Sequence, residues 1–441
     1  MAAYHAPHAG AAHSTDPYLP KHGNGGYRTR HYDLVLDYRV EANRLDGKAL
    51  ITATATQDLD QFALDLIGLR VDGVRVDGQP ARHEHRGPKL VVRPATRIAP
   101  GASFEVEVRY GGRPRPVKGP WGDIGWDELS DGALVAAQPI GAPSWFPCND
   151  HPSDKASYHV SVTAPSAYTV VVTGNLISRG RHGGGVRWVY DRPEPTSTYL
   201  MSVQVGRYAS VDLGGSVTQR AYLPQRLRPR FTHDFGRQDQ IMSLYERLFG
   251  PYPFGEYVVV VVDDPLDDPV EAQGMSIFGA NHLDGLRTHE RLAAHELAHQ
   301  WFGNSLSVAD WAQIWLNEGF ATYAEWLWSD ASGGITVDGQ ARLWHDRLMG
   351  LRQDFTLADP GPRHLFDERV YKRGGLTLHA LRRYIGDAPF FALIRAWATE
   401  HRHGLVSTEQ FVAAATKHAG KALDAFFDGW LYQTRLPAIP Q

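Results

Sequence analysis

The chain has 441 residues, enough for two or three domains at roughly 150 residues each. Apolar residues make up 43% and charged residues 21%, an ordinary balance for a globular protein with a sizeable core. The net charge of −4 gives no reason to expect a nucleic acid or an acidic membrane as a partner. A single cysteine, Cys148, excludes an intramolecular disulfide.

The first 26 residues are rich in Ala, His, Gly and Pro and show no periodicity, so we expect a flexible N-terminal arm over 1–26. Its histidines, His5, His8 and His13, are expected to belong to a solvated tail rather than to a metal site. No secretory signal is visible, and the longest strongly apolar run, 257–262, is too short to cross a bilayer. A cytoplasmic enzyme is the default expectation, without excluding a lost leader.

Alternation of apolar and polar residues dominates the chain from residue 27 onward. Strict alternation runs over 32–40, 104–110 and 158–162, and Gly, Pro, Asp and Asn punctuate the intervals. Many short alternating runs with turn residues between them predict antiparallel sheets packed as a sandwich or saddle. We therefore expect an all-β domain over 27–213.

Helical patterns dominate the second half of the chain. One apolar strand at 258–262 precedes them, and the helical patterns are expected at 289–302, 311–328, 374–384 and 411–432. Strands first and helices after predict an α+β domain over 214–441. The tryptophans of the 311–328 segment are expected to pack in its core.

The segment HELAH places His295 and His299 four residues apart, which on a helix puts both imidazoles on one face. A second helical pattern carries Glu318, with 18 residues between it and His299. An antiparallel helix pair would bring that carboxylate back to the same ion. A catalytic zinc keeps three protein ligands and one open position for water, so we predict one Zn²⁺ held by these three residues.

Glu296 directly follows the first histidine, where zinc peptidases of the HExxH type carry their general base. We expect it to take a proton from the attacking water and to pass that proton to the leaving amine. Thr322, one turn after Glu318, either supports the ligand from behind or bonds its own helix backbone.

These segments resemble the aminopeptidase N family, the gluzincin zinc aminopeptidases with HExxH-x18-E. The resemblance rests on HELAHQWFGN with DWAQIWLNEGFATYAEW, on QPIGAPSWFPCNDHPSDKASY, on PTSTYLMSVQVGRY and on LFGPYPFGEY. It implies a β-domain followed by a thermolysin-like catalytic domain that acts on peptides with a free N-terminus. Because the chain ends at FDGWLYQTRLPAIPQ, the resemblance implies a short form without the large C-terminal helical domain of many relatives.

The family's GxMEN motif, whose Glu binds the α-amino group of the substrate, is similar to DPVEA in this chain. This alignment puts Glu271 at the amine-binding position, with Gly274 and Phe278 also in line. A second register would align Met275-Ser276 with the motif and would delete the carboxylate. We prefer the first register, since a buried ammonium requires a carboxylate partner.

The family's catalytic tyrosine, in a YxKG motif, corresponds to Tyr371 in VYKRGG, where Arg373 replaces the lysine. A neutral tyrosine hydroxyl can donate a hydrogen bond to an oxyanion. Gln138 resembles a family residue that lines the first side-chain pocket.

Four readings remain open from the sequence. Exopeptidase action on peptide N-termini leads. A thermolysin-like endopeptidase would fit the second register, an epoxide hydrolase would share the zinc motif, and a non-catalytic peptide-binding protein could reuse the scaffold. The oligomeric state and the preferred N-terminal residue are not predicted.

Overall fold

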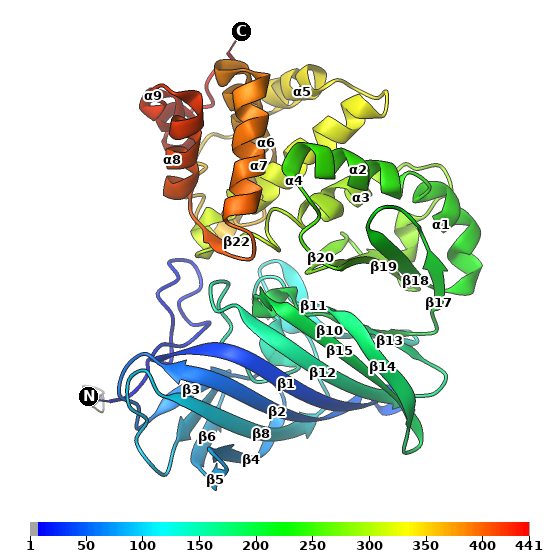
Figure 1. The fold of residues 1–441 in the computed structure, drawn as a ribbon, viewed down its shortest axis with the longest axis vertical. Coiled ribbons are helices and arrows are strands. Elements are labelled where there is room, and N and C mark those ends of the chain that lie inside the picture. Colours follow the sequence, from blue (N-terminus) through cyan, green and yellow to red (C-terminus); the bar gives the residue numbers. More distant parts are fainter. Residues whose placement is uncertain (1–7, 441) are drawn as a thin grey trace. The chain divides into compact units, whose positions relative to one another are not determined.

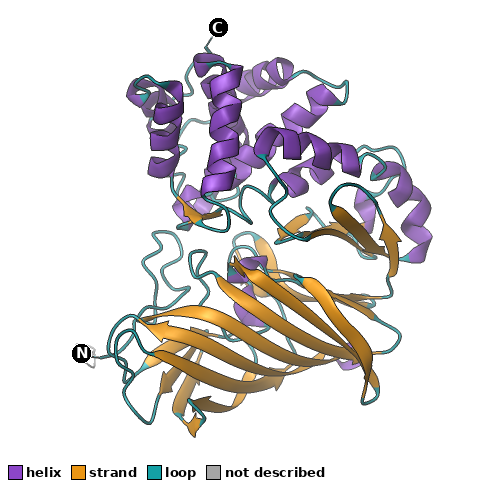
Figure 2. Ribbon diagram, in the orientation of Figure 1, coloured by secondary structure: helices purple, strands orange, loops and turns teal. Residues whose placement is uncertain are grey.

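The computed structural model of the chain describes residues 8–440. These residues form two compact units, one of 8–209 with Tyr222–Pro224 and Val262–Asp264, the other of Ser210–Ala221 with Gln225–Val261 and 265–440. Strands build the first unit, and most of the helices lie in the second (Figure 2). The predicted fold class, a β-domain followed by an α+β domain, is confirmed. The predicted boundary at residue 213 falls just after the division between the units.

An eight-stranded sheet forms the larger part of the β-unit, in the order β14-β15-β12-β1-β2-β8-β4-β5 (Figure 1). Strand β1 runs parallel to β12 and antiparallel to β2. Its alternating residues Tyr32, Leu34 and Leu36 are buried, as expected for a sheet with one covered face. The bounds are β14 Asn175–His182, β15 Gly185–Thr196, β12 Ala156–Pro165, β1 Tyr27–Arg39, β2 Arg44–Ala55, β8 Ser103–Gly112, β4 Arg70–Val76 and β5 Gln79–Pro80.

Two smaller sheets complete the β-unit. One has the order β13-β16-β11-β10-β9 and the other the order β3-β7-β6. All three sheets contribute to one hydrophobic core, to which Tyr32, Val135 and Leu90 belong. The bounds are β13 Thr169–Val172, β16 Val203–Gly206, β11 Gly132–Ala136, β10 Gly122–Leu129, β9 Val117–Gly119, β3 Phe62–Asp65, β7 Lys89–Arg93 and β6 Arg82–Arg86.

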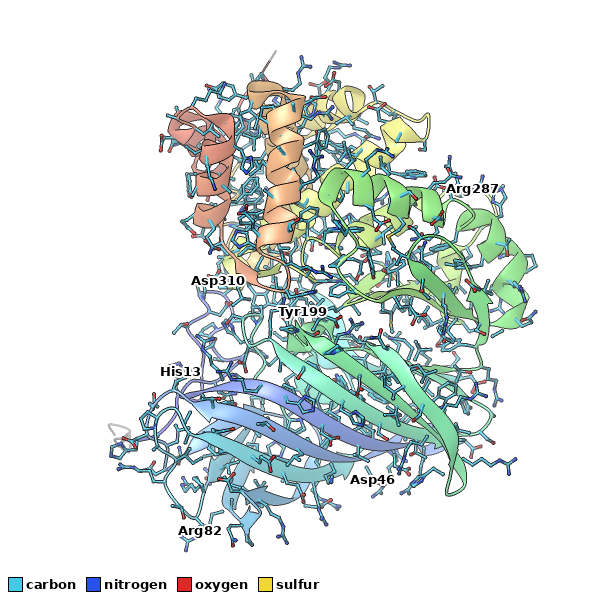
Figure 3. All side chains as sticks on the ribbon, in the orientation of Figure 1. His13, Asp46, Arg82, Tyr199, Arg287 and Asp310 are labelled. Atoms are coloured by element: carbon cyan, nitrogen blue, oxygen red, sulfur yellow. The ribbon has the colours of Figure 1, made fainter. Side chains whose placement is uncertain are left out.

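The segment 8–26, here called the N-terminal strap, is bonded to the β-unit. Gly10 N donates to Gln61 O at 2.8 Å, and Asp16 is buried. His13 of the strap is exposed (Figure 3), and His5 lies outside the described residues. The expectation of a flexible arm is therefore wrong for 8–26. Hydrophobic periodicity could not predict these contacts, because backbone groups of an irregular segment make them.

A buried carboxylate anchors the strap. Asp65, 1% exposed, accepts hydrogen bonds from Gly23 N at 3.1 Å, from Asn24 Nδ2 at 2.8 Å and from Asp150 N at 3.1 Å. Lys89 Nζ lies 2.6 Å from its other oxygen and supplies the compensating charge. Three separate segments of the β-unit thus converge on one anion.

Lys89→Met is expected to lower the free energy of unfolding by about 3–5 kcal/mol, because it leaves the buried Asp65 carboxylate without its cation. Urea denaturation followed by circular dichroism measures this loss. Arg70→Met is the matched control, since Arg70 and Asp72 form an exposed ion pair at 2.7 Å that solvent screens, so little or no loss is expected. Equal losses in the two variants would contradict the assignment.

The α+β unit contains a five-stranded sheet of order β17-β18-β19-β21-β20 and a two-stranded sheet of β22 and β23. Strand β19 is the predicted apolar run, and its valines are buried. The strand bounds are β17 Ala209–Asp212, β18 Thr218–Leu223, β19 Glu256–Val262, β21 Met275–Gly279, β20 Val270–Ala272, β22 Ser307–Val308 and β23 Leu405–Val406. No helix within residues 8–440 is both long enough and apolar enough to cross a bilayer.

Three helices of this unit matter for the site: α3, α4 and α6. Helix α4 packs against both of the others. Its Gly319 faces Gly374 of α6 so closely that a Cβ on Gly319 would lie 2.8 Å from the Gly374 Cα, so the two backbones touch. The helix bounds are α1 Arg228–Asp234, α2 Gln238–Phe249, α3 Glu290–Ala298, α4 Trp315–Ala331, α5 Val337–Met349, α6 Glu368–Ile385, α7 Asp387–Glu400, α8 Thr408–Ala419 and α9 Asp424–Phe427.

Candidate active site

Helices α3 and α4 bring the three predicted ligands together. His295 lies in α3, and His299 is the residue that ends it. The Nε2 atoms of both histidines lie 3.4 Å from Oε2 of Glu318, which occupies the first turn of α4. All three side chains are buried. One ion could therefore contact two imidazole nitrogens and one carboxylate oxygen.

The connection between the helices explains why Glu318 returns to the histidines. The chain turns at Gly303, where φ is +119°, a conformation that favours glycine. A Cβ there would also lie 3.2 Å from Nδ1 of His299. Asp310 (Figure 3) then accepts a hydrogen bond from Ala312 N at 3.0 Å and caps the turn that leads into α4.

The second nitrogen of each histidine faces an acceptor. Nδ1 of His295 lies 2.7 Å from Oε1 of Glu325, and Nδ1 of His299 lies 3.1 Å from the carbonyl oxygen of Phe302. In the neutral form of each histidine, Nδ1 therefore carries the proton, and the Nε2 lone pair is free on the side of Glu318. Two neutral imidazoles and a carboxylate are a donor set that fits zinc.

Glu325 is a functional residue that the sequence reasoning missed. It lies seven residues after Glu318 and thus on the same face of α4, a spacing that could have pointed to it. Burial opposes its ionisation, but Lys372 and His295 outweigh that cost and lower the pKa of Glu325 to about 2. Thr322, considered for this supporting role, has no hydrogen-bond partner for its hydroxyl among the described residues.

Two further carboxylates lie beside the three ligands. Glu296 from α3 and Glu271 from β20 are 4% and 6% exposed, and each places a carboxylate oxygen within 4.8 Å of a nitrogen of His299. Within residues 8–440, Oε2 of Glu296 and Oε1 of Glu271 have no hydrogen-bond partner. Burial raises the pKa of both carboxyl groups. Such a pair is suited to hold a proton and to receive a cation.

The hairpin of β20 and β21 sets the position of Glu271. Gly274 turns the hairpin with φ of +78°, and its N–H donates to Oε1 of Gln300 on the helix side at 2.7 Å. Ser276, which the alternative register would place at the motif, bonds Tyr257 at 2.7 Å instead. The carboxylate at the site is therefore that of Glu271, as in the preferred register.

Tyr371 reaches the same site from α6. Its ring stacks on the imidazole of His295 with a centroid separation of 6.1 Å and an interplanar angle of 16°. Burial, followed by the charges of Glu318 and Glu271, raises the pKa of Tyr371 well above its ordinary value. The hydroxyl is thus a neutral donor at physiological pH.

Two other residues were singled out from the sequence, Arg373 of α6 and Gln138 of the β-unit. Arg373 donates to the carbonyl oxygens of Trp430 at 3.1 Å and Thr434 at 2.8 Å, and so anchors the C-terminal segment to α6. Gln138 belongs to the β-unit, where a cis peptide bond joins it to Pro139. Its assignment to a side-chain pocket stays a prediction.

Comparison with known proteins identifies the family of the chain. The family model described as "Peptidase M1 N-terminal domain" matches residues 28–200, and the model described as "Peptidase family M1 domain" matches residues 234–430. The chain belongs to peptidase family M1. The resemblance to zinc aminopeptidases noted in the sequence is thereby confirmed at the level of the family.

Solved structures extend the likeness to the whole chain. The M1 zinc metallopeptidase of Deinococcus radiodurans shares 31% identity at a TM-score of 0.86, over 97% of this chain and 98% of that one. A mutant of it bound to a Tyr-Ser-Ala substrate gives 29% identity and a TM-score of 0.87, over 97% and 99%. Family, neighbours and donor set together indicate zinc as the cofactor.

Curated relatives are longer. Aminopeptidase M1-A of Oryza sativa subsp. japonica is 26% identical over 71% of this chain and 38% of its own length. Probable M1 family aminopeptidase 1 of Encephalitozoon cuniculi is 24% identical over 93% of this chain and 51% of its own length. The chain thus spans about half or less of these proteins.

Zinc binding is expected to release about two protons at pH 7, because ligand imidazoles must be neutral. Burial opposes protonation of both histidines, but Glu318 and Glu325 raise the pKa of His295 to about 9, and Glu271 and Glu318 raise that of His299 to about 10. Both are protonated below those values, so zinc affinity should rise as the pH increases from 6 toward 9.

Isothermal titration of the metal-free chain with zinc, in buffers of different ionisation enthalpy, counts the released protons. A release close to zero at pH 7, or an affinity independent of pH, would contradict the raised pKa values.

Proposed function

We propose that this protein is a zinc aminopeptidase that removes the N-terminal amino acid from peptides. The observation that carries the proposal is a pair of buried carboxylates, Glu296 and Glu271, beside the cluster of His295, His299 and Glu318. Each of the two has one oxygen without a hydrogen-bond partner in the part of the chain that the structure describes. One carboxylate is needed for proton transfer, and the other can receive the α-ammonium group of a free N-terminus. A substrate cut at an internal bond has no free α-ammonium group for the second carboxylate to bind.

When bound by His295, His299 and Glu318, zinc supplies a Lewis acid for the peptide carbonyl and lowers the pKa of water to about 7. Glu296 accepts a proton from the attacking water and later delivers it to the nitrogen of the leaving peptide. Its raised pKa suits both halves of this transfer, because the group must hold the proton between them.

Tyr371 donates its hydroxyl hydrogen to the carbonyl oxygen as negative charge develops there. Glu271 binds the substrate ammonium and thereby fixes the distance between the chain terminus and the bond that is cut. Gly274, which turns the hairpin of Glu271, acts by positioning that carboxylate. The named aminopeptidase relatives and the Tyr-Ser-Ala complex of the structural neighbour support a substrate of this class. A cytoplasmic location stays a proposal from the sequence.

Chromogenic aminoacyl substrates with a free amine should be cleaved, whereas their N-acetylated forms should resist, because an acetyl group removes the cation that Glu271 receives. Glu271→Gln should lower kcat/KM for free-amine substrates by roughly 10²-fold, the order expected when a charge-assisted contact of about 3 kcal/mol is lost. Equal rates on free and acetylated substrates would refute the amino-terminal requirement and favour the endopeptidase reading.

Glu296→Gln should retain zinc and lose activity by at least about 10²–10⁴, the usual contribution of general acid–base catalysis. Steady-state kinetics with metal analysis of the variant provides both readouts. Full activity of the Glu296 variant would remove that residue from the mechanism.

Tyr371→Phe should lower kcat by about 10²–10³ with KM little changed, as for other oxyanion donors. Steady-state kinetics of the variant measures both constants. A change in KM alone would assign Tyr371 to substrate binding.

A further inference from the structure

Lys372 is a buried cation that the chemistry above does not use. It follows Tyr371 in α6, and its side chain is 8% exposed. Its Nζ lies 4.0 Å from Oε1 of Glu325 and 4.8 Å from the centre of the Trp344 ring on α5. Burying an ammonium group is costly unless an opposite charge compensates for it, so the pair with Glu325 is the feature to explain.

Glu325 faces cations on both of its oxygens. Oε1 receives the hydrogen bond of His295 Nδ1 and faces Lys372, while Oε2 lies 3.5 Å from Arg291. The Arg291 side chain is 62% exposed and is therefore screened by solvent. Of these two basic side chains, Lys372 is the buried one.

The neighbouring basic residue is committed to another partner. The guanidinium of Arg373 donates to carbonyl oxygens of the C-terminal segment, among them those of Gly429 and Gln433. Successive residues of a helix point about 100° apart, so Arg373 and Lys372 face different neighbours. Lys372 is thus the cation that α6 supplies to Glu325.

We propose that Lys372 is a positioning residue of the zinc site. It holds the Glu325 carboxylate where Oε1 accepts a hydrogen bond from Nδ1 of His295. This hydrogen bond keeps Nε2 of His295 directed at Glu318. The inference rests on the proposed zinc site but not on the reaction catalysed there. Helix α6 therefore contacts His295 directly, through the stacked ring of Tyr371, and indirectly, through the pair of Lys372 with Glu325.

Lys372→Met in the full chain should weaken zinc binding by roughly 10–100-fold, the range for residues that support a metal ligand. Competition with a chromophoric chelator measures the zinc Kd without reference to peptidase activity, so failure of the proposed reaction would remain distinguishable. Lys372→Arg should recover most of the affinity, because it keeps the cation. Lys421→Met is the matched control, since Lys421 is exposed and lies 3.9 Å over the ring of Tyr384.

The double variant tests the route of the effect. Glu325→Gln alone should weaken zinc binding, and adding Lys372→Met should cause little further loss if Lys372 acts through Glu325. Losses that multiply in the double variant would overturn the proposal. So would a Lys372→Met chain that binds zinc as tightly as the parent while its Tm falls. Should the Met variant not fold, Lys372→Gln replaces it in the same titrations.

Discussion

The catalytic unit depends on one electrostatic constraint, the burial of several carboxylates in a small volume. Glu271, Glu296 and Glu318 lie around the two histidines with almost no access to water. Like charges at such separations repel, and removing each from water adds to the cost. The same carboxylates raise the pKa of both histidines, and a divalent cation that replaces the histidine protons, with a substrate ammonium, would offset the repulsion further. The carboxylate cluster therefore favours binding of both cations.

The fold holds this cluster together through close helix packing. The contact between Gly319 and Gly374 lets the backbones of α4 and α6 touch, one residue from Glu318 and three from Tyr371. Any larger side chain at this crossing would push Glu318 away from Tyr371. The hairpin of β20 and β21 adds Glu271 from a different element. Rigid elements, rather than loops, thus determine most distances in the site.

The sequence predicted those features that follow from local periodicity. Alternation predicted the β-domain, and the four-residue spacing of His295 and His299 predicted a shared helix face. Glu318 required only one more assumption, an antiparallel return of the next helix. The packing of the strap at 8–26 was not predicted, because its backbone hydrogen bonds follow no periodic sequence pattern. Its hydrogen bonds to Asp65 also join residues that are far apart in the chain. Glu325 was missed because its seven-residue spacing from Glu318 predicts a shared helix face, whereas the imidazole that it contacts is decided by tertiary packing.

For the two basic residues after Tyr371, the position in an aligned motif does not predict which groups the side chain contacts. Arg373 occupies the family's lysine position, yet its guanidinium binds carbonyl oxygens at the C-terminal end of the chain. Lys372, at the variable position of the motif, faces the carboxylate behind His295. A planar fork suits several carbonyls at once, whereas a compact ammonium suits one carboxylate beside an aromatic ring. Exchanging the two side chains would keep the charge of α6 but would mismatch both partners, so their order carries information that the charge alone does not.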